Sequence, residues 1–296
     1  MGKKPRWKNE SEFNEFLVGQ YLRYGSVDEV LKKNNFDIPI SYANYHRILD
    51  KWGIIKAAGP NSKLNESLDF LYQLAQTNIP FDSLYTKMPS SFKTSAATLY
   101  RVLSYIKEGI TRRVGTGLII TPHDNETKVL LGSDRSTPRD KYGKTYGALT
   151  IPIGFSRIRD LRKDAILRVL QQEVFAENAI EQKMPDIIPE SAKPFMFLDI
   201  ADVRVEVFHI VLPKRLSNAK CFSSFKLYDH RFMSLETILR GDTKTRKYRA
   251  GIISGAMGYK KYLELKKRNL TSNPLYIKSR LNYQLSSNLQ FQEPEV

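Results

Sequence analysis

Residues 154–176 read GFSRIRDLRKDAILRVLQQEVFA, and this stretch decides the fold of the chain around it. Positions 169, 172 and 173 are spaced i, i+3 and i+4, so they share one face of a helix. The residues on that face are Val169, Gln172 and Glu173. The stretch therefore predicts a loop followed by a helix that presents a single carboxylate at these three positions.

The stretch resembles a degenerate Nudix box, whose intact motif is G-x5-E-x7-R-E-U-x-E-E-x-G-U, with U an aliphatic residue. The positions that match or conserve the type of residue are Gly154, Asp160, Arg168, Leu170, Glu173 and Ala176. The positions that depart from the motif are Val169, Gln172 and Phe175, which replace two acids and the second glycine. The resemblance implies that the fold of the family is kept while part of its set of catalytic residues is lost.

In an intact box, the helix carboxylates hold Mg²⁺ against a diphosphate and help to position the attacking water. Val169 has no ligand atom, and Gln172 offers only a neutral carbonyl. If hydrolysis survives, the resemblance implies Mg²⁺ held weakly by Glu173, aided by Glu177 at i+4 or by Asp160. A structural alternative is that Asp160 pairs with Arg168 across the loop, while Glu173 is solvated or joins that arginine.

The resemblance extends over about residues 114–265. Residues 116–121 and 128–132 read as two apolar strands around a turn at 124–125, and residues 204–212 read as a strong strand. Residues 151–154 resemble the approach to the box, and residues 232–240 resemble a late helical segment. The implied fold is a Nudix-like α/β/α sandwich with a mixed sheet.

Composition places limits on the class of protein. The chain has 296 residues, which suggests about two domains, and its 41% hydrophobic and 26% charged content is ordinary for a globular protein. No apolar run is long enough to cross a bilayer, and the first residues lack the apolar core of a secretory signal. The only cysteine is Cys221, which excludes an intrachain disulfide and a cysteine metal cluster. We expect a cytoplasmic protein with no membrane partner.

The net charge of +16 indicates a polyanionic partner. Residues 1–113 carry 17 basic and 11 acidic groups (net +6), and residues 241–296 carry 11 and 4 (net +7). Residues 114–240 carry 19 and 16, a net of only +3. The excess charge therefore lies mainly on the two flanks of the Nudix-like region.

The first 113 residues contain an internal repeat. Residues 41–49 (SYANYHRIL) align with residues 95–103 (SAATLYRVL), and a Gly-Ile pair follows each segment. Short helix candidates precede them, one opened by a capping box at residues 26–29 and the other at residues 80–86. Longer helices are expected at about 12–24 and 65–76. With a tight turn before each last helix, the pattern predicts tandem helix-turn-helix units, the second winged-helix-like.

The predicted partner of these units is double-stranded DNA. In each last helix, Tyr45, Ile48 and Leu49, or Leu99, Val102 and Leu103, would face the unit's own core. The outward residues that suit the major groove are Tyr42, Asn44, His46, Arg47, Ala96, Thr98, Tyr100 and Arg101. Residues 110–114 would form a wing strand from which Arg112 and Arg113 touch the DNA backbone. The alternative is a pair of bundles that dock protein instead.

The predicted ligand-binding residues follow from the resemblance, because the substrate of the family enters between the loops and the box helix. They are Arg135, Arg139, Lys141 and Lys144, in a basic loop of residues 135–145, together with Arg168 of the helix. His209 lies in an apolar strand and is predicted to be a hydrogen-bonded interior group.

The predicted fold class is α+β multidomain. The expected domains are helix-turn-helix units at 1–58 and 59–113, a Nudix-like domain at 114–269 and a loosely held polar tail at 270–296. The predicted function is a sequence-specific DNA-binding transcriptional regulator, whose non-catalytic Nudix domain senses a nucleotide-like or phosphorylated ligand or mediates homodimerisation. The alternatives are a divalent-metal-dependent Nudix hydrolase of nucleoside diphosphate derivatives and a non-catalytic adaptor that binds protein.

Overall fold

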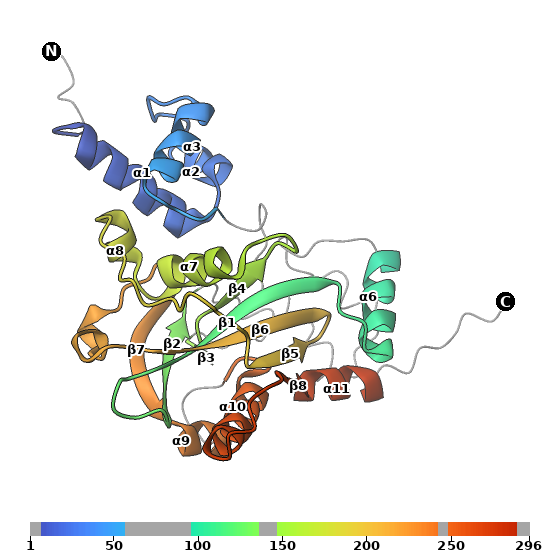
Figure 1. Cartoon of the computed structure of the whole chain (residues 1–296). Coiled ribbons are helices and arrows are strands. Elements are labelled where there is room, and N and C mark those ends of the chain that lie inside the picture. The colour runs from blue at the N-terminus through green and yellow to red at the C-terminus, as the bar shows by residue number, and fades with distance from the viewer. Residues whose placement is uncertain (1–6, 57–95, 136–146, 242–247, 289–296) are drawn as a thin grey trace, which may run out of the picture.

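Two β-sheets form the centre of the chain in the computed structural model, which describes residues 7–56, 96–135, 147–241 and 248–288 (Figure 1). The larger sheet has the order β4-β1-β6-β5-β8. Its strands are β1 (Arg113–Thr121), β4 (Ile153–Ser156), β5 (Met196–Ile200), β6 (Val203–Val211) and β8 (Leu275–Lys278). The β1–β6 and β5–β8 pairs are parallel, and the β1–β4 and β5–β6 pairs are antiparallel. The sheet is therefore mixed, as predicted.

The smaller sheet is antiparallel and has the order β3-β2-β7. Its strands are β2 (Lys128–Asp134), β3 (Leu149–Thr150) and β7 (Leu227–Ser234). The predicted strands at 116–121 and 128–132 are present as parts of β1 and β2, but they belong to different sheets and do not pair with each other. Each strand pairs elsewhere, β1 with β6 and β2 with β7.

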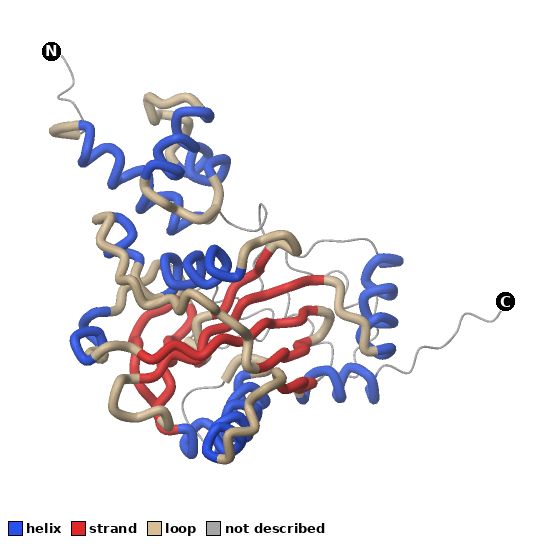
Figure 2. The backbone as a smooth tube through the Cα atoms, viewed as in Figure 1, coloured by secondary structure: helices blue, strands red, loops and turns tan. Residues whose placement is uncertain are grey.

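Helices cover both faces of the larger sheet (Figures 1 and 2). The box helix α7 (Arg162–Glu173) lies on one face and is followed by α8 (Ala176–Ile180). The other face packs against α6 (Ala96–Glu108), α9 (Leu235–Arg240), α10 (Ile252–Lys267) and α11 (Arg280–Asn288). Two short 3-10 helices occupy Lys214–Leu216 and Ala219–Cys221. The two faces of β6 contribute to two separate apolar cores. Val205 and Val207 pack toward α10 in the main core, and Phe208 packs toward α7 in a second core on the other face.

Three N-terminal helices form a small bundle: α1 (Glu10–Tyr24), α2 (Val27–Lys33) and α3 (Tyr42–Lys51). Asn9, Ser26 and Ser41 cap their N-termini, each accepting a hydrogen bond from a backbone N–H three residues later. The bundle core includes Tyr45 and Leu49, both fully buried, as predicted for α3. The predicted tight turn before α3 is wrong, because residues 34–41 form a longer connection.

The second predicted unit differs from the expectation where it is described. The predicted helices at 65–76 and 80–86 lie outside the described residues. Helix α6 does not face a core of its own: Val102 and Leu103 are buried with the strands of the large sheet and with α11. The predicted wing strand at 110–114 is also wrong, because β1 begins at Arg113 and runs through the centre of that sheet.

The C-terminal segment is not the loose tail that its polar composition suggested. Strand β8 extends the large sheet beside β5, and α11 follows it at once. Leu281 and Leu285 are 2% and 1% exposed in the main core. Their spacing of four places both on one side of the helix, so two apolar residues are enough to anchor a mostly polar segment. Residues 289–296 lie outside the described residues.

Candidate functional site

The loop before the box helix is closed by an ion pair. Asp160 accepts a hydrogen bond from the N–H of Arg157 at 2.8 Å, and its carboxylate lies 2.7 Å from the guanidinium of Arg168. The same guanidinium donates to the carbonyl of Phe155 at 3.4 Å, and Arg168 is only 4% exposed. The predicted pairing of Asp160 with Arg168 is confirmed, and it fixes the loop against the helix.

Glu173 at the end of α7 is buried, with 3% of its surface exposed. Its Oε2 accepts the N–H of Ile153 at 2.8 Å, which ties the start of β4 to the helix. Burial raises the pKa of its carboxyl to about 7, although the ammonium of Lys226 and the hydrogen bond from Ile153 oppose that rise. Both structural expectations for Glu173 are therefore wrong, because it is neither solvated nor bonded to Arg168.

The segment after the 3-10 helices brings a lysine to the box helix. Ser224 Oγ donates to the carbonyl of Gln172 at 2.8 Å and accepts the N–H of Lys226 at 2.9 Å. The Nζ of Lys226 donates to Oε1 of Gln172. At the next residue of the helix, Nε2 of His230 donates to the carbonyl of Glu173 at 2.7 Å. Burial lowers the pKa of His230, so its imidazole is favoured in the neutral form.

These residues do not fit a Mg²⁺ ion. Val169 is 2% exposed and packs in the apolar core under α7. The amide oxygen of Gln172 is bonded to the ammonium of Lys226, and one carboxylate oxygen of Glu173 is bonded to Ile153. Within the described ranges, no three His, Cys, Asp or Glu residues are grouped so as to hold a metal. The exposed side chain of Glu177 and the paired side chain of Asp160 do not complete such a set.

The box helix instead binds the N-terminal bundle. Nε of Arg168 donates to the carbonyl of Lys56 at 2.8 Å. The amide of Gln171 donates to the carbonyl of Gly53 at 2.7 Å and accepts the N–H of Ile55 at 3.0 Å. Nearby, the indole of Trp52 donates to the carbonyl of Ile180 at 2.9 Å.

This docking was not predicted from the sequence. Gln171 occupies the variable position of the box, so the motif predicts no role for it. Arg168 was predicted to bind the ligand. Ala176 and Ala179 of α8 also share the apolar core of the bundle. Ala176 is the last position of the box and Ala179 follows it, and two small side chains spaced by three are a sequence signal of close helix packing.

The outer face of α3 carries the residues predicted to contact DNA in the first unit. Tyr42 is 50% exposed, and Asn44 and Arg47 are also exposed. His46 is half-buried beside Tyr42, with ring centres 4.7 Å apart, and burial lowers its pKa. Asn44 and Arg47 point away from the buried Tyr45 and Leu49. Tyr42 and His46 each lie three residues before one of these buried residues, so they border the buried face of α3 and do not lie opposite it.

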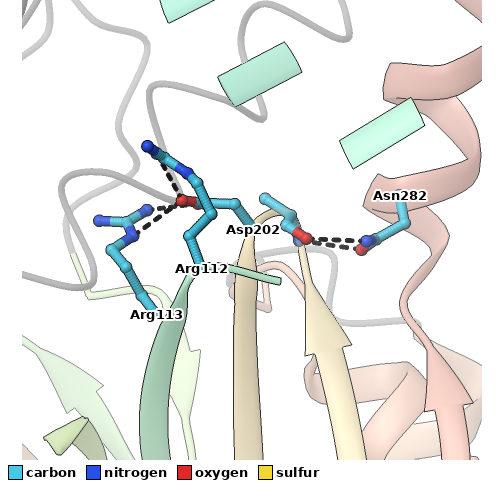
Figure 3. A network of polar contacts seen from close by, with 5 residues as sticks. Arg112, Arg113, Asp202 and Asn282 are labelled. Atoms are coloured by element: carbon cyan, nitrogen blue, oxygen red, sulfur yellow. Dashed lines mark hydrogen bonds and ion pairs between the residues drawn. The ribbon is translucent and has the colours of Figure 1, made fainter. Parts of the chain in front are cut away.

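In the second unit, the predicted DNA contacts are not assembled in the same way. On α6, Thr98 is half-buried and Arg101 is exposed, and the side chain of Tyr100 lies outside the described residues. Arg112 and Arg113 both bind the fully buried carboxylate of Asp202, with a shortest distance of 2.5 Å (Figure 3). These two arginines bind the turn between β5 and β6. The wing prediction had placed them on the DNA backbone and had given them no partner within the protein.

The adjacent turn residue is held from the other side. The side-chain amide of Asn282 pairs with both the N–H and the carbonyl of Ala201, each at 2.9 Å (Figure 3). The β5–β6 turn is thus tied to the start of β1 and to α11 at once. This network is part of the scaffold of the sheet.

Of the predicted basic ligand loop, the structure describes Arg135. Its N–H donates to the carbonyl of Lys226 at 2.8 Å, and its guanidinium lies 5.3 Å from the ring centre of Tyr228. Its charge also acts on the imidazole of His230. Arg139, Lys141 and Lys144 lie outside the described residues. His209 of β6 is hydrogen-bonded to Thr121 and Tyr259, at 3.0 Å each, as predicted for an interior group.

No family model and no curated protein matches the chain. Among solved structures, an ADP-ribose pyrophosphatase from Streptococcus suis is 16% identical, with a TM-score of 0.36, over 56% of this chain and 99% of that one. A C. elegans Ap4A hydrolase is 13% identical, with a TM-score of 0.35, over 53% and 99% of the two chains. A MutT protein from Methanosarcina mazei is 13% identical, with a TM-score of 0.34, over 54% and 96%. Each corresponds to about half of this chain.

None of the helices in the described part of the chain is long and apolar enough to cross a membrane.

Proposed function

We propose that the chain is a sequence-specific regulator that binds double-stranded DNA, with a non-hydrolytic Nudix-like domain that senses a nucleotide-like or phosphorylated ligand. The proposal rests on the groups that the box helix binds. Its polar residues Arg168 and Gln171 bind the backbone of residues 53–56 after α3, and its metal-ligand positions are not filled by free carboxylates. The helix supports a docked bundle.

The docked bundle leaves the outer face of α3 exposed. Asn44 and Arg47 are the residue types that bind adenine and guanine edges in the major groove, and Arg47 also suits a phosphate. The opposite side of α3 is buried in the bundle, so these side chains are displayed from a packed helix. The net charge of +16 supplies long-range attraction to a polyanion.

Arg168 offers a physical route between the ligand domain and the bundle. One guanidinium binds Asp160 in the loop before the box helix and the carbonyl of Lys56 after α3. A ligand that favours one arrangement of the loop therefore also favours one arrangement of the segment after α3. Such coupling requires the two arrangements to differ in affinity for the ligand.

The proposal is tested by selecting binding sites from a random duplex pool at about 0.2 M salt, where attraction to phosphates alone is weakened. We expect an enriched motif. Alanine at Arg47 or Asn44 should weaken binding to that motif by about 5-fold or more, since a base contact contributes about 1–3 kcal/mol. The matched control is Lys33→Ala, which removes an exposed charge from α2 instead of α3. It should weaken binding to all sequences by a similar small factor.

A pool that shows no enrichment would contradict DNA recognition and favour a protein-docking bundle. Equal losses for Arg47→Ala and Lys33→Ala would contradict recognition through α3. Arg101→Ala measures separately whether the exposed arginine of α6 contributes to the same site.

The hydrolase alternative is favoured by one observation. Glu173 keeps the last acid position, and its pKa of about 7 suits a general base near neutral pH. This reading predicts Mg²⁺-dependent hydrolysis of nucleoside diphosphate derivatives that is lost in Glu173→Gln. Turnover that survives in Glu173→Gln, or no turnover in the wild type, counts against it.

A further inference from the structure

The large sheet has two unlike faces near its β8 edge. On one face, alternate residues such as Leu198, Val205 and Ile277 pack in the main core. On the opposite face, Phe197 is half-buried and Tyr276 is 69% exposed. Helix α7 packs on that face over β1 and β4, toward the edge opposite β8 (Figure 1). The β8 end of the face therefore presents aromatic side chains to solvent.

Two of these aromatic rings are stacked beside a guanidinium. Phe197 and Tyr276 face each other across the β5–β8 pair, with ring centres 4.9 Å apart and ring planes at 30°. The guanidinium of Arg204 lies 5.9 Å from the ring centre of Tyr276. Asp199 fixes it by accepting hydrogen bonds from Arg204 at 2.9 and 3.0 Å. Flat aromatic and cationic groups are thus held in place, which lowers the entropy cost of binding a ligand.

A cavity of about 230 Å³ adjoins Phe197. It lies where α7, β5 and β8 begin, and α10 contributes one side. The lining residues include Arg162, Lys193, Phe197, Tyr262, Ser272 and Asn273. The cavity therefore combines an aromatic ring with cationic and hydrogen-bonding side chains next to the stacked pair.

The outer surface of this face is cationic although it contains two carboxylates. Asp199 is paired with Arg204, and Glu206 is paired with Arg162 at 3.3 Å. The carboxylate side chains are 10% and 24% exposed, whereas the arginine side chains are 38% and 50% exposed. Lys193 adds an exposed cation at the cavity. The cations therefore lie outermost, so the face attracts an anionic ligand.

We propose that this face binds single-stranded nucleic acid. Bases of an unpaired strand stack on Tyr276 and enter the cavity beside Phe197, and Arg162 and Lys193 contact the phosphates. A duplex keeps its base faces inside its own stack, so the aromatic pair distinguishes a single strand from a duplex.

The site is separate from the residues already described. It lies toward the β8 edge of the sheet, whereas Glu173 is bonded to Ile153 in β4 at the opposite edge. It uses no residue of α3. Single-strand binding is therefore a function in addition to the proposed recognition of duplex DNA.

Fluorescence anisotropy of the full chain with a labelled oligouridine of about 12 nucleotides tests the proposal. Tyr276→Leu keeps an apolar side chain next to Phe197 but removes the exposed ring. We expect it to weaken strand binding about 5-fold or more and to leave duplex binding unchanged. The matched control is Tyr283→Leu, which replaces a tyrosine that is 64% exposed on α11, and it should bind as the wild type does.

A second variant tests the cationic contact. Lys193→Gln should reduce the slope of log affinity against log salt by about 0.7, the value for one phosphate contact in a single strand. Lys220→Gln, at another exposed lysine, should leave the slope unchanged. Circular dichroism melting establishes that each variant is folded.

Three outcomes overturn the proposal. The first is an absence of strand binding by the wild type. The second is a Tyr276→Leu variant that binds the strand as the wild type does, or that loses strand and duplex binding equally. The third is complete displacement of the strand by millimolar uridine monophosphate, which would mean that the site takes a single nucleotide.

The two DNA and strand proposals fail independently, because they depend on different residues. Arg47→Ala should leave strand binding unchanged, and Tyr276→Leu should leave binding to a selected duplex motif unchanged. An enriched duplex motif without strand binding overturns only the single-strand site. Strand binding that is lost in Tyr276→Leu, with no enriched duplex motif, overturns only the role of α3.

Discussion

Single residues of the box helix have partners both in the loop before it and in the segment after α3. Arg168 keeps the arginine position and uses it to join the loop, through Asp160, to the carbonyl of Lys56. Glu173 occupies the last acid position of the motif, but it is buried and accepts a hydrogen bond from the N–H of Ile153. These two residues therefore fix the shape of the loop and of the helix.

The buried carboxyl of Glu173 should make stability depend on pH. Its pKa rises from 4.5 to about 7 on folding, so the folded protein holds this proton more tightly than the unfolded chain. The contribution of Glu173 to the free energy of unfolding therefore falls as pH rises from about 4.5 to 7, and the cost persists above pH 7. Glu173→Gln keeps an oxygen for Ile153 without the charge. We expect the variant to exceed the wild type by about 3 kcal/mol at pH 8 and to match it near pH 4.

Urea denaturation at the two pH values measures this difference. Glu177→Gln is the control, because that side chain is exposed and its replacement should give no gain that depends on pH. A Glu173→Gln variant less stable than the wild type at pH 8 would show that the carboxylate, paired with Lys226, stabilises the fold.

At the scale of elements, α7 faces two partners. Its apolar residues pack on the sheet, and its polar residues hold the segment that leaves α3. The helix itself was predictable from its spacing and from the box. Its second partner was not, because Gln171 and Ile55 are 116 positions apart in the chain and no local pattern links them.

The docking of residues 53–56 should depend on Gln171. Gln171→Ala removes two hydrogen bonds, to Gly53 and Ile55, and each contributes about 1 kcal/mol. We expect the amide of Ile55 to exchange with deuterium about 10-fold faster in the variant, while amides inside the sheet keep their rates. The control is Lys163→Ala, on an exposed position of the same helix. Unchanged exchange at Ile55 would mean that apolar packing alone holds the bundle.

At the scale of the whole molecule, the two ends of the described body meet. Helix α6 precedes the first strand and α11 follows the last one, and they pack against each other in the main core. Nearby, Asp202 and Asn282 tie the β5–β6 turn to β1 and α11 (Figure 3). The C-terminal segment thus belongs to the body of the protein.

Truncating a core side chain of α11 should therefore destabilise the whole body. Leu285 is 1% exposed, and Leu285→Ala should lower the free energy of unfolding by about 2–4 kcal/mol through lost burial and a cavity. Tyr283→Ala is the control, since Tyr283 is 64% exposed on the same helix, and it should change stability by less than about 0.5 kcal/mol. Chemical denaturation followed by circular dichroism compares the two. Equal small losses would mean that α11 contributes little to the core.

The sequence by itself determined the features that depend on neighbours along the chain. It predicted α1, α2 and α3 from their caps and spacing, the loop and helix at 154–176, the Asp160–Arg168 pair, and the main strands of a mixed sheet. Short-range spacing decides which side chains share a face and which backbone groups are capped, so these elements can be read locally.

Only the tertiary structure decided the partners of those elements. It placed α6 and α11 on the sheet, paired Arg112 and Arg113 with Asp202, and brought Lys226 to Gln172. A polar segment such as 275–288 gains its order from two buried leucines and a neighbouring strand, which its composition does not reveal. Buried charges and amides must find partners, and which partner is close depends on how the chain returns to itself.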